Sequence, residues 1–92
     1  MADSALTPDE LIIRGERAKQ ILDDELVKEA LKDIRQTIVE NWQKVPLRDT
    51  ELQTKFHMLY GVVDQFEAKL RQHIESGEVG KYDLKTKRFG VF

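Results

Sequence analysis

The sequence predicts an all-α protein: an antiparallel helical hairpin of two long helices, with a shorter helix before it and an extended tail after it. Apolar residues recur every three or four positions over most of the chain, which is typical of amphipathic helices. Helix-capping residues precede each periodic segment, and Pro46 separates the two longest segments.

The first helix is expected at about residues 8–22. Thr7 can cap it, Pro8 suits the first helical position, and Glu10 completes a capping box. Gly15 lies inside this helix and weakens it by roughly 1 kcal/mol relative to alanine. Either Gly15 lets another backbone approach closely, or this helix is marginal by itself.

The second helix is expected at about residues 25–44, with Asp24 as its cap. The alternative is one continuous helix that passes through Asp23 and Asp24. Trp42 ends the apolar face, where it either packs against the third helix or anchors a partner. The residues that share this face are Val27, Ala30 or Leu31, Ile34, Ile38 and Trp42.

The third helix is expected at about residues 51–76, antiparallel to the second because the connection between them is short. Asp49 or Thr50 caps it, and Thr50 with Gln53 forms a second capping box. Gly77 is expected to end it as a left-handed cap residue. A seven-residue apolar repeat, typical of a coiled-coil seam, comprises Leu52, Phe56, Leu59, Val63, Phe66, Leu70 and His73 or Ile74.

A second apolar set, Met58 and Val62, lies beside this seam and makes the apolar arc wider than two paired helices require. The first helix could cover the excess, and so could another subunit. Gly61, in the middle of the helix, would permit close approach on that side.

Residues 77–92 are expected to form an extended, basic and apolar arm outside a helical domain of residues 1–76. Alternating side chains give a weak strand signal. Bases mixed with aromatics are typical of single-strand nucleic-acid binding, whereas an apolar end fits a docking arm that adds a strand to a neighbour's sheet. A frayed terminus is the third alternative. The candidate partner-binding residues of the arm are Tyr82, Leu84, Lys85, Lys87, Arg88, Phe89, Val91 and Phe92.

Composition argues against several classes of protein. Fifteen basic and seventeen acidic residues give a net charge of -2, which provides no general attraction to nucleic acid or anionic membrane. The absence of cysteine excludes disulfides and thiolate chemistry. No apolar run approaches the roughly 20 residues that span a bilayer, and the first residues do not resemble a secretory signal.

No catalytic, cofactor-binding or metal-binding residue is expected. Neither His57 nor His73 has a His, Asp or Glu four positions away, so a helical metal site is not encoded locally. Asp23 and Asp24 suit a helix cap better than an acid–base pair. The stretch 14–17 contains one glycine and is no phosphate-binding loop.

Four segments carry a resemblance to a family: residues 14–19, 22–24 and 48–51, and Trp42. With these segments the chain resembles a group of small helical proteins encoded by tailed bacteriophages, among the genes for head and tail assembly. The resemblance covers roughly residues 11–75. It implies a virion or assembly role and transfers no catalytic residue.

The leading hypothesis is therefore a non-catalytic structural or adaptor subunit of a phage virion, present in the host cytoplasm during assembly. Its partners would be larger capsid, portal or tail proteins, with self-association as a further possibility. One alternative is a phage-encoded inhibitor or regulator that binds a host protein. Another is a nucleic-acid-binding assembly factor that acts through its basic tail.

Overall fold

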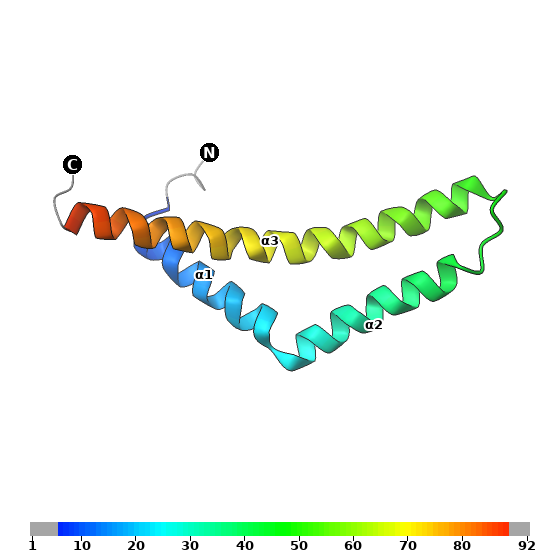
Figure 1. The fold of residues 1–92 in the computed structure, drawn as a ribbon, viewed down its shortest axis with the longest axis horizontal. Coiled ribbons are helices and arrows are strands. Elements are labelled where there is room, and N and C mark those ends of the chain that lie inside the picture. Colours follow the sequence, from blue (N-terminus) through cyan, green and yellow to red (C-terminus); the bar gives the residue numbers. More distant parts are fainter. Residues whose placement is uncertain (1–5, 89–92) are drawn as a thin grey trace. The chain divides into compact units, whose positions relative to one another are not determined.

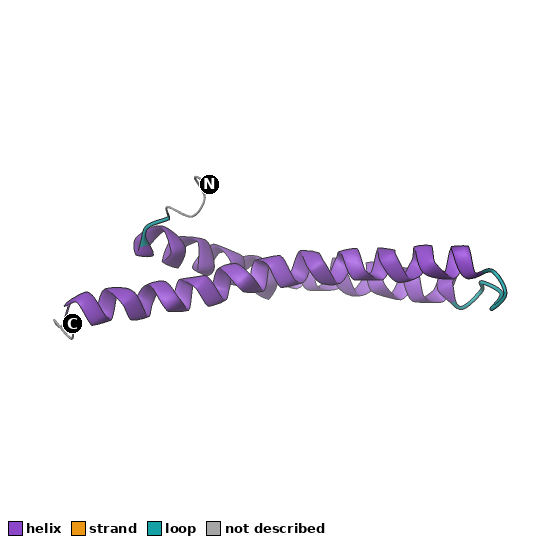
Figure 2. Ribbon diagram, turned by 90° about the horizontal axis from the view of Figure 1, so that it is seen from above, coloured by secondary structure: helices purple, strands orange, loops and turns teal. Residues whose placement is uncertain are grey.

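The computed structural model describes residues 6–88 of the chain, and every regular element among them is a helix (Figures 1 and 2). The order is α1 (Pro8–Asp23), α2 (Glu25–Trp42) and α3 (Thr50–Arg88). The prediction of an all-α chain is confirmed for these residues. They divide into two compact units: the α1 unit, residues 6–22 with 69–88, and the α2 unit, residues 23–68. Helix α3 contributes to both.

The three helix starts lie where the capping residues predict them. Thr7 and Glu10 form the capping box: the Glu10 amide donates to Thr7 Oγ1 at 3.2 Å, and the Thr7 amide donates to Glu10 Oε1 at 2.8 Å. Asp24 separates α1 from α2, since its Oδ1 accepts from the amides of Leu26 and Val27. The predicted break at the two aspartates is confirmed.

At the start of α3, one of the two predicted caps is confirmed and the predicted capping box is not. Asp49 is the cap, because its Oδ1 accepts from the Leu52 amide at 3.2 Å. The expected box between Thr50 and Gln53 does not form. The Gln53 side chain points instead to the turn before α3, where it bonds to Trp42 and to two backbone carbonyls.

The prediction that α3 ends at Gly77 is wrong. The helix continues to Arg88, so residues 77–88 are helical and not an extended arm. Gly77 and Gly80 are both buried within α3. Glycine is needed at these positions because a neighbouring helix packs closely there, and not because the chain turns. Residues 89–92, with Phe89, Val91 and Phe92 of the expected arm, lie outside the described residues.

The α1 unit is held together by a close approach of two helix backbones. A Cβ added to Gly15 would lie 2.8 Å from the His73 carbonyl oxygen and 3.1 Å from the Gly77 Cα. A Cβ added to Gly80 would lie 2.9 Å from the Pro8 carbonyl oxygen. Ala18, 3% exposed, is the buried apolar residue of the described chain. Of the two explanations given above for Gly15, close approach of a second backbone is confirmed.

The α2 unit pairs α2 with the first half of α3. Trp42, at the end of α2, contacts Gln53 and His57 near the start of α3. Arg35, two turns earlier in α2, pairs with Asp64 and Glu67, which come later in α3. These contacts therefore follow opposite orders along the two helices.

The predicted seam on α3 is partly wrong. Phe56, Val63 and Leu70 are half-buried as expected. The other three apolar residues of the predicted seam are exposed: Leu52, Leu59 and Phe66. Ile34 of the predicted α2 face is exposed as well. The neighbouring ladder Gln53, Tyr60 and Glu67 is half-buried instead. The physical reason is that Trp42 and Arg35 of α2 need polar partners, which Gln53 and Glu67 supply.

Candidate interaction site

The turn between α2 and α3 is fixed by one glutamine. Trp42 Nε1 donates to Gln53 Oε1 at 2.6 Å. Gln53 Nε2 donates in turn to the carbonyl oxygens of Val45 and Pro46, at 3.2 and 3.3 Å. A single side chain therefore satisfies an indole and two carbonyls of a turn where Pro46 prevents helical continuation.

Trp42 lies at the mouth of a surface cavity of about 280 Å³ formed by this turn. Its ring also tilts against that of His57, with centroids 5.9 Å apart. The lining residues are Val39, Trp42, Gln43, Val45, Leu47 and Gln53, none of which titrates near neutral pH. Leu47, at the rim, is 90% exposed. A mostly apolar hollow beside a protruding leucine suits the binding of an apolar side chain.

An ion-pair cluster ties α2 to α3 further along the unit. Arg35 Nη2 lies 2.6 Å from Glu67 Oε1 and 3.1 Å from Asp64 Oδ1, and Arg35 Nε also donates to Asp64. The Glu67 hydrogen bond raises the pKa of Arg35 above its ordinary value, so the guanidinium stays charged. A forked pair of this kind fixes position more than it stabilises, because Asp64 is largely exposed.

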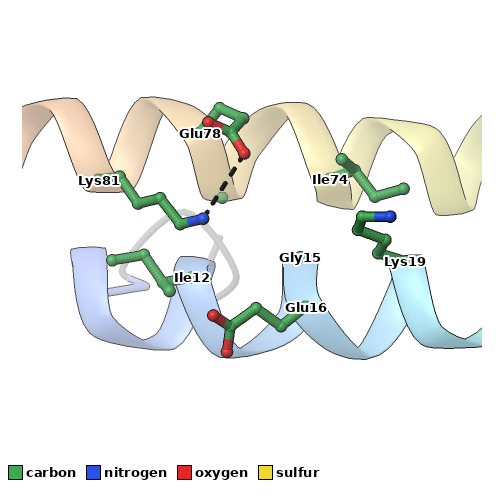
Figure 3. Close-up of a pocket in the computed structure, with 8 residues that line it drawn as sticks. Ile12, Gly15, Glu16, Lys19, Ile74, Glu78 and Lys81 are labelled. Carbon is green, nitrogen blue, oxygen red and sulfur yellow. Dashed lines mark ion pairs between the residues drawn. The ribbon is translucent and has the colours of Figure 1, made fainter.

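A further cavity lies in the α1 unit and is too small for a substrate. It measures about 40 Å³, room for about one water molecule. Figure 3 shows Ile12 on α1 and Ile74 on α3, with the Lys81–Glu78 ion pair (3.6 Å) also on α3, and all four residues line the cavity. The backbones at Gly15 and Gly77 approach too closely to leave more space.

The structure places the other predicted partner-binding residues on different surfaces. Met58 and Val62 are both exposed, one turn apart on α3. Tyr82 and Leu84 do not share a face, because two residues in a helix are about 200° apart. Tyr82 and Lys85 are exposed, and Leu84 is half-buried. Lys87 and Arg88 are in α3, but their side chains lie outside the description.

The sequence analysis did not predict the contact of Gln53 with Trp42, the place of Leu47 in the cavity lining, or the ion pairs of Arg35. The contact of Gln53 with Trp42 could have been predicted. A tryptophan next to a turn needs an acceptor for its indole N–H, and Gln53 is a polar residue shortly after that turn. Leu47 follows Pro46 in a segment that cannot be helical, so the sequence already indicates an apolar side chain on a turn. Nothing in the sequence ties Arg35 to Asp64 and Glu67 across the fold.

Residues 6–88 contain neither a metal-binding cluster nor a membrane-spanning helix. No cluster of three or more His, Asp or Glu side chains in this range could hold a metal ion. No described helix has the length and apolar character needed to cross a membrane.

Comparison with known proteins adds no identity: no family model, no curated protein and no solved structure matches this chain. The resemblance to phage helical proteins stays a prediction.

Proposed function

We propose that this chain is a non-catalytic subunit that binds a larger protein through the turn end of its α2 unit. The observation that carries the proposal is the Trp42 cavity with the exposed Leu47 at its rim. Tryptophan is among the residues that contribute most to binding energy at interfaces, especially where it is held in place before binding.

The contacts around Trp42 provide that preorganisation. The hydrogen bond to Gln53 fixes the indole, and the two bonds from Gln53 to Val45 and Pro46 fix the turn that carries Leu47. Little conformational freedom is then lost on binding, which favours affinity. The cavity volume of about 280 Å³ accommodates one large apolar side chain from a partner.

In this proposal α2 and α3 form the antiparallel hairpin expected from the sequence and present the turn at its tip. The opposite order of the contacts at Trp42 and Arg35 supports that layout. The resemblance of residues 11–75 to phage assembly proteins supplies the setting, a structural or adaptor role in a virion. Repeated copies on a symmetric particle would bind with avidity, so each single contact can be modest.

The test is incorporation into phage particles. A phage lacking the chain is complemented with wild-type protein or with Leu47→Asp, and purified particles are quantified by mass spectrometry. We expect wild type at fixed stoichiometry and a loss of Leu47→Asp, because a carboxylate would be placed at the rim of an apolar interface. Leu47 is 90% exposed, so the substitution leaves the fold intact.

The matched control is Leu26→Asp. Leu26 is also an exposed leucine, but it lies in the first turn of α2, where an acidic residue is favourable. We expect this variant to incorporate normally. Absence of wild-type protein from the particles would contradict the virion role and favour a regulator that binds a host protein.

A further inference from the structure

Two seven-residue ladders run side by side along the α3 segment of the α2 unit. One ladder, Gln53, Tyr60 and Glu67, is half-buried, and its first and last members bond to side chains of α2. The other consists of Leu52, Leu59 and Phe66, and it is exposed, with Leu59 at 51% and Phe66 at 52%. A sustained seven-residue apolar repeat is the pattern of a helix–helix seam. Here the helix that α3 packs against does not cover it.

A residue of α2 extends this exposed surface. Ile34 precedes Arg35, and Phe66 precedes Glu67, so each lies about 100° around its helix from the ion pair. Because the helices run in opposite directions, the same offset brings Ile34 and Phe66 to the same side of the pair. The apolar face defined here comprises Ile34, Leu52, Leu59, Val62 and Phe66, all of them exposed.

We propose that a second copy of this chain covers the apolar face, so that two α2 units form a symmetric four-helix dimer. A two-helix layer with one apolar side completes a bundle when it packs on an identical layer. Two-fold symmetric homodimers, in which the same patch meets itself, are the commonest soluble oligomers. This inference does not depend on a virion role.

The charges beside the apolar face determine how the two copies face each other. On α2 the outer edge of the face carries Asp33 and Glu40, seven residues apart and both exposed. On α3 the outer edge carries Lys55 and Lys69 on either side of Val62, also exposed. If α2 lies against α3 of the other copy, acids meet lysines. If α2 lies against α2, like charges meet, which is unfavourable.

Sedimentation equilibrium of the full chain over a wide range of concentrations tests the proposal. We expect the mass of two chains for wild type. Leu59→Lys with Phe66→Lys should reduce the mass to one chain, with the helical circular dichroism retained because both side chains are exposed in the single chain. The control is Val79→Lys, an exposed apolar residue of the α1 unit, which should remain dimeric.

A second set of variants reverses the charges at the edge of the apolar face. Restored dimerisation in such a set cannot be attributed to a defect in folding. Lys55→Glu with Lys69→Glu should weaken the dimer, and adding Asp33→Lys with Glu40→Lys should restore it, because the opposite charges meet again with exchanged signs. A mass of one chain for wild type at every concentration would overturn the proposal and leave the face to a different protein. So would a dimer that Leu59→Lys with Phe66→Lys does not change. The Leu47→Asp variant should stay dimeric, because Leu47 is not part of the apolar face. A failure of the docking proposal can therefore be told apart from a failure of the dimer proposal.

Discussion

Single residues without side chains determine the packing of the α1 unit. Gly15, Gly77 and Gly80 each cost their helix roughly 1 kcal/mol relative to alanine. In return they allow helix backbones to approach to distances at which a Cβ would lie 2.8–3.1 Å from backbone atoms of the other helix. Gly61 is different, because a Cβ there would meet nothing within 4 Å. The four glycines of the described helices thus fall into two classes.

This difference predicts opposite effects of the same substitution. Gly15→Ala should destabilise the protein, because overpacking against the His73 carbonyl costs about 1–3 kcal/mol, more than the helix-propensity gain of about 1 kcal/mol. Gly61→Ala, the matched control, should stabilise it by about 0.5–1 kcal/mol. Urea unfolding followed by circular dichroism measures both. A stabilised Gly15→Ala variant would contradict the close helix contact.

Glu10 is a second residue with a testable environment. Hydrogen bonds from the Thr7 backbone and side chain lower the pKa of Glu10 below the 4.5 of an unperturbed glutamate. A lowered folded-state pKa gives stability that is present above pH 4.5 and is lost as the pH falls through the folded value. NMR titration should show a Glu10 midpoint below 4.5, and Thr7→Ala should move it upward. An unchanged midpoint in Thr7→Ala would contradict the capping box.

At the scale of elements, helix starts could be predicted and the end of α3 could not. The caps Thr7, Asp24 and Asp49 act on amides within three residues, so the local sequence contains the whole interaction. Gly77 has two possible uses, a left-handed cap or a site of close helix packing. Which of the two uses applies to Gly77 depends on its contact with α1, about sixty residues earlier in the chain. The sequence around Gly77 does not indicate this contact.

The face of α3 was predicted about one position away from the true one for a similar reason. The apolar residues Leu52, Leu59 and Phe66 give the stronger periodic pattern, so hydrophobicity alone selects them as the seam. The structure places Gln53 and Glu67 against α2 because Trp42 and Arg35 need polar partners there. Contact of Trp42 with α3 is one of the two alternatives predicted from the sequence, and it is confirmed, whereas its role as a partner anchor stays a prediction. The positions of Leu47 and Gln53 beside Trp42 were not predicted.

The turn between α2 and α3 provides a prediction at the element scale. Gln53→Leu should destabilise the α2 unit by about 1–3 kcal/mol, because the Trp42 indole and two carbonyls lose a part-buried partner. Gln65→Leu, at an exposed glutamine of the same helix, is the control and should change stability little. Chemical denaturation monitored by Trp42 fluorescence measures both. Equal stability of the two variants would show that Gln53 does not hold the turn.

At the scale of the whole molecule, apolar side chains are more often exposed than buried. Among the described residues Ala18 is the buried apolar one, and a dozen large apolar or aromatic side chains are exposed. A chain with this distribution gains stability by association, since burial of apolar area is the main favourable contribution to folding and assembly. The apolar face and the Trp42 cavity share no residue, so the dimer proposal and the docking proposal are compatible with each other.

The dimer proposal requires that Leu59 lies outside the α2–α3 contact and that Tyr60 lies inside it, in line with the exposed Leu59 and the half-buried Tyr60. The chain has no cysteine, so thiol-labelling rates of the single variants Leu59→Cys and Tyr60→Cys compare these two positions directly. We predict faster labelling at position 59, with a rate that rises as the protein is diluted and the dimer dissociates, and slow labelling at position 60 throughout. Faster labelling at position 60 than at position 59 in dilute protein would contradict the account.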